Sequence, residues 1–155
     1  MRNVIHAGMA AAVSFLLAAC AGQRPDNLVP RDGRLAACPS SPNCVSSQAG
    51  DADHAIAPLH YRGDRRTAFE GLKRVLTDFE RTSIVDRGDT WLHAECRSAV
   101  MGFVDDVIFS FTEPGRIHVR SASRLGYSDM GVNRRRIEQL RVLFEQTVHL
   151  PGQAK

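Results

Sequence analysis

Two segments of the chain carry apolar residues at intervals of three and four, the spacing that puts them on one face of a helix. They are residues 65–80 and residues 133–148, and Asn133 is the expected N-cap of the second. Each predicted helix therefore has one stripe to bury and a charged side to expose. The stripes consist of Phe69, Leu72, Val75, Leu76 and Phe79 in the first helix and of Ile137, Leu140, Leu143, Phe144 and Val148 in the second.

Between these segments the apolar positions alternate with polar ones, which is typical of strands that bury one face. Turn sequences at residues 87–89 and 113–115 separate strands near 82–86, 90–98, 103–111 and 116–123. Residues 55–61 predict a short edge strand, because Pro58 cannot donate a backbone hydrogen bond within a sheet.

The order of these elements predicts the fold class. Short turns between successive strands indicate an antiparallel sheet, and the two apolar stripes need the same sheet face. We therefore predict a two-layer α+β domain, in which two helices pack on one face of a four- or five-stranded, mainly antiparallel sheet. The opposite face is either an ordinary solvated surface, the commoner case, or a binding surface. It collects His93, Glu95, Arg97, Asp106, Arg116, His118 and Arg120.

Residues 1–19 have the pattern of a bacterial lipoprotein signal peptide. A basic start at Arg2 precedes an apolar run, residues 7–19, that is too short to span a membrane comfortably. Small residues then lead directly into Cys20, which resembles a lipobox and predicts lipid attachment at that thiol. A secretory signal with an incidental cysteine is the alternative. Because no aspartate follows Cys20, we expect a periplasm-facing protein whose lipid anchors it to the bacterial cell envelope, at the outer membrane.

The mature chain is expected to hold one domain, at residues 37–150, joined to the lipid by a polar, proline-containing tether at residues 20–36. Cys38 and Cys44 end a short loop, and in an oxidising compartment they predict a disulfide. A metal site and a reactive thiol are weaker alternatives, because the spacing matches no common zinc motif and no base is adjacent. Cys96 falls on the apolar parity of its strand and is expected to be buried. We predict neither a metal nor a cofactor.

The composition is that of an ordinary globular domain, with 43% hydrophobic and 24% charged residues. The net charge of +3 is too small to indicate nucleic-acid binding. Three arginines, however, stand at residues 134–136, where a helix starts and its amides are already partly positive; each costs up to about 1 kcal/mol unless it is screened. Arg134 has Glu138 one turn away, and Asp105, Asp106 or Asp129 offer internal ion pairs. The other solution is a bound anion.

Three stretches of the chain resemble, in order, the signatures of domain-of-unknown-function family 1499. They read CPSSPNCVSSQA, LHAECRSAVMGFVDDVIFSF and IHVRSASRLGYSDMGVNRRRIEQLR, within residues 35–148. The resemblance implies an exported or lipoprotein bacterial member, with no established activity, cofactor or substrate. The family pattern carries onto Pro42, Asn43, Cys44, Val45, Ser46, Ser47, Arg97, Ser98, Asp105, Asp106, Arg120, Ser121, Ser123, Arg124, Gly126, Asp129, Gly131, Asn133 and Arg134.

These observations favour a non-enzymatic envelope lipoprotein that binds an anionic or polar partner through its arginine- and serine-rich loop. The candidate ligand-binding residues are Arg97, Arg120, Ser121, Ser123, Arg124, Asp129, Asn133 and Arg134. A structural or assembly role with another envelope protein is the main alternative. A hydrolase is a weaker one, because the chain has no nucleophile elbow, zinc-protease motif or phosphate loop. It would draw on Ser46, Ser47, Ser121 or Ser123, on His54, His60, His93 or His118, and on Asp105 or Asp106.

Overall fold

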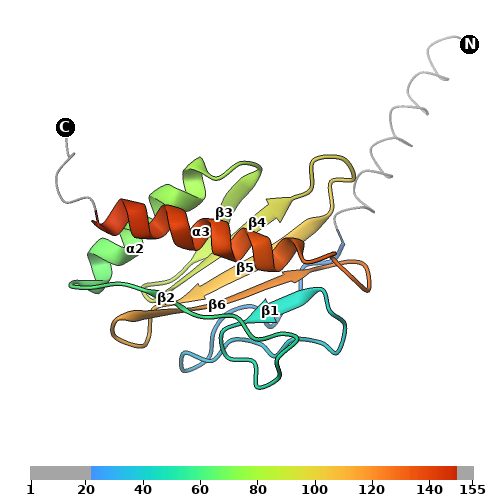
Figure 1. Ribbon diagram of the computed structural model, residues 1–155, viewed down its shortest axis with the longest axis horizontal. Helices are drawn as coiled ribbons and strands as arrows, with labels where there is room; N and C mark the ends of the chain where they lie inside the picture. The colour runs from blue at the N-terminus through green and yellow to red at the C-terminus, as the bar shows by residue number, and fades with distance from the viewer. Residues whose placement is uncertain (1–21, 150–155) are drawn as a thin grey trace, which may run out of the picture.

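The two predicted helices are present as α2 (Arg65–Asp78) and α3 (Val132–His149) in the computed structural model, which describes residues 22–149 (Figure 1). Helix α2 begins at the N-cap Asp64, whose carboxylate accepts a hydrogen bond from Thr67 N at 2.8 Å. Both helices bury most of their predicted stripes. Leu143 is an exception, since it is 40% exposed although the periodicity of α3 predicts that it is buried.

The strands form an antiparallel sheet, as predicted, in which the order is β1-β6-β5-β4-β3 and β2 pairs with β6. Their bounds are β1 (Cys44–Ser46), β2 (Leu59–His60), β3 (Thr82–Arg87), β4 (Trp91–Arg97), β5 (Val104–Ser110) and β6 (Arg116–Ser123). The count of six exceeds the four or five expected, because β1 was not predicted and the expected edge strand is present as β2. The two-layer α+β class is confirmed.

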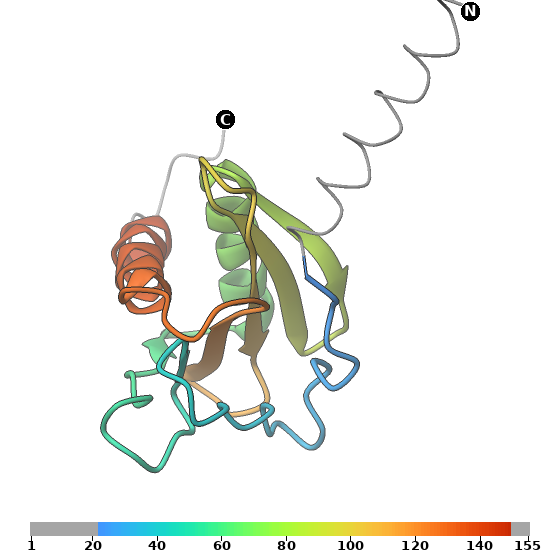
Figure 2. The ribbon, with the colours of Figure 1, turned by 90° about the vertical axis from the view of Figure 1, so that its right-hand side faces the viewer.

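Both helices cover the same face of the sheet (Figure 2). The layer between them and the sheet is the hydrophobic core, where Leu72 and Leu76 of α2 meet Phe109 of β5 and Phe144 of α3, all fully buried. Phe69 adds a ring contact to Phe111, with centroids 5.1 Å apart. Burying one such side chain stabilises the fold by about 1.5–3 kcal/mol, so this layer dominates its stability.

The second face of the sheet is neither open nor solvated throughout, because residues 22–40 lie against it (Figure 2, blue). Leu28 of this segment is buried, and Arg24 Nη2 lies 2.6 Å from Glu95 Oε1. Gly33 approaches Thr112 so closely, at φ 77°, that a Cβ there would overlap the Thr112 hydroxyl. Much of the segment predicted as a tether is therefore attached to the domain.

The cysteines of the domain are arranged as expected. Cys38 and Cys44 form a disulfide, and Cys96 is a free, buried thiol. Burial raises the pKa of Cys96, which keeps it an unreactive thiol. The predicted signal peptide and Cys20 lie outside the described residues. No helix within residues 22–149 is long and apolar enough to cross a membrane.

Candidate functional site

The two adjacent aspartates of β5 point to opposite faces of the sheet, as the pleat of a strand requires. On the helix face, Asp105 Oδ2 accepts a hydrogen bond from Arg136 Nη2 at 2.5 Å, and both side chains are about nine-tenths buried. On the other face, Asp106 accepts two hydrogen bonds from Arg124, at 2.8 and 2.7 Å. Each aspartate therefore neutralises one arginine.

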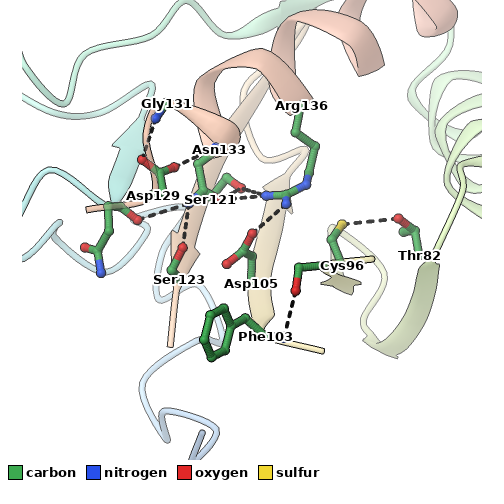
Figure 3. Close-up of polar contacts among 12 residues, drawn as sticks. Thr82, Cys96, Phe103, Asp105, Ser121, Ser123, Asp129, Gly131, Asn133 and Arg136 are labelled. Carbon is green, nitrogen blue, oxygen red and sulfur yellow. Dashed lines mark hydrogen bonds and ion pairs between the residues drawn. The ribbon is translucent and has the colours of Figure 1, made fainter. Parts of the chain in front are cut away.

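A cluster of polar side chains joins the first turn of α3 to the sheet, and Asn133 is its centre (Figure 3). The Asn133 Oδ1 atom accepts hydrogen bonds from Ser121 Oγ at 2.5 Å and from Arg136 Nη1 at 2.7 Å. Its Nδ2 atom donates to Ser123 Oγ at 3.0 Å and to the carbonyl of Asn43 at 3.1 Å. Asn133 is fully buried, and these bonds use both ends of its amide.

The predicted N-cap at Asn133 is therefore wrong. Helix α3 starts one residue earlier, and the capping carboxylate is Asp129, which accepts hydrogen bonds from Gly131 N at 2.9 Å and from Asn133 N at 2.7 Å. An acid at this end also offsets the positive partial charge of the helix start. Asp129 thus has a structural role that the sequence spacing did not single out.

Arg124 lies in a group of charges on the second face, where it, Glu95 and Asp106 are buried. Its Nη2 atom is 2.6 Å from Glu95 Oε1, and Glu95 also binds Arg24 and, at 3.2 Å, Arg97. Burial alone would raise the pKa of Glu95 and of Asp106, but hydrogen bonds from Arg124, together with Arg24 for Glu95 and His93 for Asp106, outweigh it, and both pKa values are lowered. The bonds to Asp106 raise the pKa of Arg124. Both carboxylates are therefore charged and matched at neutral pH.

Two further arginines of the predicted site bind backbone carbonyls. Arg134 donates to the carbonyls of Ala55 at 2.7 Å and Asp53 at 2.8 Å, which holds that loop against α3. Arg120 is 8% exposed, reaches only the carbonyl of Ala37 at 3.4 Å, and its Nε has no hydrogen-bond partner among the described residues. Burial of this weakly bonded guanidinium lowers the pKa of Arg120.

The predicted ligand-binding residues therefore do not surround one cavity. Ser121, Ser123 and Asn133 meet on the helix face, whereas Arg120 and Arg124 lie on the other face of the sheet. Of the two arrangements that the sequence allows, Arg124 and Arg136 adopt the internal ion pairs, with Asp106 and Asp105. None of the eight candidates except Arg97 lines the groove described next.

An open groove of about 950 Å³ runs between α3 and the adjoining ends of β3 and β4. Its exposed apolar wall comes from α3, where Val132 and Leu143 are 40% and Val142 is 52% exposed. Cys96 and the Asp105–Arg136 ion pair lie at its base. The remaining lining residues are Phe79, Glu80, Arg81, Arg97, Ser98, Ala99, Arg135, Glu138 and Gln139. The sequence missed this groove because the periodicity of α3 assigns Leu143 to the core.

One Ser–His–carboxylate chain is also present. Ser47 Oγ lies 3.1 Å from His118 Nδ1, and His118 Nε2 lies 2.8 Å from Glu113 Oε2. The hydrogen bond to His118 lowers the pKa of Glu113. Ser47 Oγ also accepts a hydrogen bond from Val119 N at 2.9 Å, so the hydroxyl helps to join β1 to β6. Within residues 22–149 no group of three or more His, Cys, Asp or Glu side chains is placed to hold a metal ion.

The fold and the polar cluster define a two-layer α+β domain whose last helix is fixed to the sheet by Asn133 and Arg136. A family model described as "Protein of unknown function (DUF1499)" matches residues 34–144, and the chain belongs to this family. No curated protein and no solved structure gives a significant match.

Proposed function

We propose that this protein is a non-enzymatic binding protein of the bacterial cell envelope, anchored by a lipid on Cys20, and that it binds an amphipathic ligand in the groove beside α3. The observation that carries the proposal is the exposed apolar wall formed by Val132, Val142 and Leu143. A groove of about 950 Å³ matches the size of small-molecule sites, which are concave and mainly apolar.

The charges around the groove support an anionic end on the ligand. Arg135 of α3 is exposed at the groove and donates to the carbonyl of Met130, whereas the Arg97 side chain binds Glu95 on the second face of the sheet. The Arg135 guanidinium has donors to spare for a carboxylate or phosphate. We still expect an anionic or polar partner, but the binding cation is Arg135 rather than Arg124 or Arg134.

The test compares two valines of similar exposure. Val142 lines the groove and is 52% exposed, whereas Val29 is 49% exposed in the N-terminal segment on the other side of the sheet. Displacement of the fluorescent probe N-phenylnaphthylamine by palmitate measures binding. Val142→Glu should weaken palmitate binding at least tenfold, about 1.4 kcal/mol, and Val29→Glu should leave it unchanged.

Equal affinities in both variants and the wild type, at unchanged melting temperature, would refute the groove as the ligand site. A photocross-linker placed at Val142 separates the ligand classes in cells. Adducts with envelope lipid agree with the proposal, and adducts with one envelope protein reassign the chain to the assembly role.

A serine hydrolase is the second candidate function, favoured by the chain of hydrogen bonds from Ser47 through His118 to Glu113. Such a chain activates a hydroxyl when the histidine accepts its proton. The bond from Val119 N to the same hydroxyl assigns it a structural role instead. We expect no labelling by a fluorophosphonate probe. Labelling that Ser47→Ala and His118→Ala both abolish would establish the hydrolase and remove the non-enzymatic proposal.

A further inference from the structure

Exposed large apolar side chains gather at one end of the sheet. Residues 98–103 connect β4 to β5 and residues 124–131 connect β6 to α3; both loops lie at this end because β5 is antiparallel to its two neighbours. Arg124 N donates to the carbonyl of Val104 at 3.1 Å, so the loops are adjacent. Of the ten exposed large apolar residues within residues 22–149, seven form what we call the apolar tip: Val100, Met101, Phe103, Leu125, Tyr127, Met130 and Val132.

The apolar tip differs from an ordinary protein surface, on which single apolar residues are scattered among charges. Val100 is 90%, Met130 is 87% and Tyr127 is 76% exposed. Residues 98–103 contain no charged side chain. In residues 124–131 the two charged groups are already engaged, because Arg124 is paired with carboxylates and Asp129 caps α3. The tip therefore offers apolar area whose one acid, Asp129, is bonded to the amides at the start of α3.

Positive charge borders the tip. Glu95 and Asp106 carry two negative charges, whereas Arg24, Arg97 and Arg124 around them carry three positive ones. The side chains of Arg24 and Arg97 are 47% and 53% exposed, so the excess charge faces solvent. An apolar patch with a basic margin is the pattern of surfaces that bind anionic membranes.

The N-terminal segment leads to the same end of the molecule. Gly22 packs against the loop that follows β6, since a Cβ on Gly22 would lie 2.8 Å from Arg124 Cβ and 3.0 Å from Leu125 Cγ. Gly22 is two residues from Cys20, a span of at most about 7 Å. A lipid on Cys20 would consequently hold the apolar tip next to the bilayer.

We infer that the apolar tip docks into the bilayer interface beside the anchor, an inference that rests on the proposed lipid attachment at Cys20. Val100, Met101 and Tyr127 enter the boundary between headgroups and acyl chains, and tyrosine is enriched at this interface. Arg24 and Arg97 meet anionic headgroups. Val132 belongs to both the tip and the groove, so the groove begins next to the docked tip. An amphipathic ligand could then pass from the membrane directly into the groove.

The test uses the mature lipoprotein in vesicles of phosphatidylethanolamine and phosphatidylglycerol whose acyl chains carry bromine, which quenches tryptophan on contact. Trp91 is the single native tryptophan and begins β4, at the opposite end of the sheet, so it is an internal reference. The expected result is strong quenching of the tryptophan in Tyr127→Trp, about twofold for an indole at the headgroup–acyl boundary, and no quenching of Trp91 in the wild type. Adding Met101→Asp should remove most of that quenching, and adding Val29→Asp should not.

Mass spectrometry of the N-terminal peptide separates the two ways of failing. An acylated Cys20 together with an unquenched indole in Tyr127→Trp overturns the docking inference and leaves the anchor in place. A Cys20 without lipid overturns the anchor and the inference with it. If the tip is instead covered by a second copy, sedimentation in detergent shows a dimer that Met101→Asp dissociates, and this result also overturns membrane docking.

Discussion

Removing the Asp105 carboxylate should destabilise the domain more than removing an exposed acid. Asp105 and Arg136 are 10% and 9% exposed and their atoms approach to 2.5 Å. In Asp105→Ala the Arg136 guanidinium keeps only the neutral acceptors Asn133 and Ser121, so a buried charge loses its counter-ion. The expected loss is about 3–5 kcal/mol, a large part of the roughly 5–15 kcal/mol that stabilises a domain of this size.

The assay is urea unfolding at pH 7 of Asp105→Ala, Arg136→Met and the double variant. The double variant leaves no unpaired charge. Its loss in free energy of unfolding should therefore be smaller, by about 2 kcal/mol or more, than the sum of the losses in the two single variants. Glu70→Ala is the matched control, since its ion pair with Lys73 has the acid 54% exposed, and it should cost about 1 kcal/mol or less. If Asp105→Ala lowers the free energy of unfolding no more than Glu70→Ala does, the Asp105–Arg136 ion pair is not desolvated and does not fix α3 to β5.

Three further predictions concern other parts of the structure. The pKa values of Glu95 and Asp106 are lowered in the folded state. The stability that these carboxylates contribute is therefore complete above their unfolded pKa values of about 3.9–4.3, and it is lost as the pH falls through their folded pKa values. The free energy of unfolding, measured by urea titration, should accordingly fall below about pH 4. Arg120→Met should raise the free energy of unfolding by about 1–3 kcal/mol, since it removes a buried donor that has no partner among the described residues; a loss instead would show that the contacts of Arg120 with Ala37 and its attraction to Asp106 outweigh the cost of that donor. Replacing Cys38 and Cys44 with alanine should cost about 2 kcal/mol in thermal unfolding, the amount expected for so short a loop, and no change would indicate that the bond is open in solution.

Periodicity predicts the long elements of this fold and misses the short ones. Helices α2 and α3 and strands β3 to β6 each extend over enough residues for a period of 3.6 or 2.0 to be visible. Strand β1 has three residues, and its place is set by partners far along the chain, such as Ser121, which pairs with Val45. The segment at 22–36 is held in the same way, by Arg24 on Glu95, 71 residues away. Local patterns contain no information about such contacts.

The polar site shows the same division. Strand parity alone predicts that Asp105 and Asp106 point apart, and the alternative of internal ion pairs followed from the nearby arginines. Which arginine each aspartate takes depends on how α3 lies across the sheet, so the 31-residue separation of Asp105 and Arg136 is not visible in the sequence. Asn133 and Asp129 are both good capping residues, and only the start of α3 at Val132 decides between them.

The unfavourable arginines at the start of α3 are explained by what they connect. Arg136 joins α3 to β5, Arg134 joins it to the loop at 53–55, and Asp129 supplies the acid that a helix start favours. On the other face, Arg124 joins the loop after β6 to Glu95 of β4 and Asp106 of β5, and Glu95 also binds Arg24 of the segment that leads back to Cys20. These arginines therefore hold together the end of the sheet that carries the apolar tip. A rigid tip loses little conformational freedom on docking, which lowers the cost of binding a membrane or a ligand.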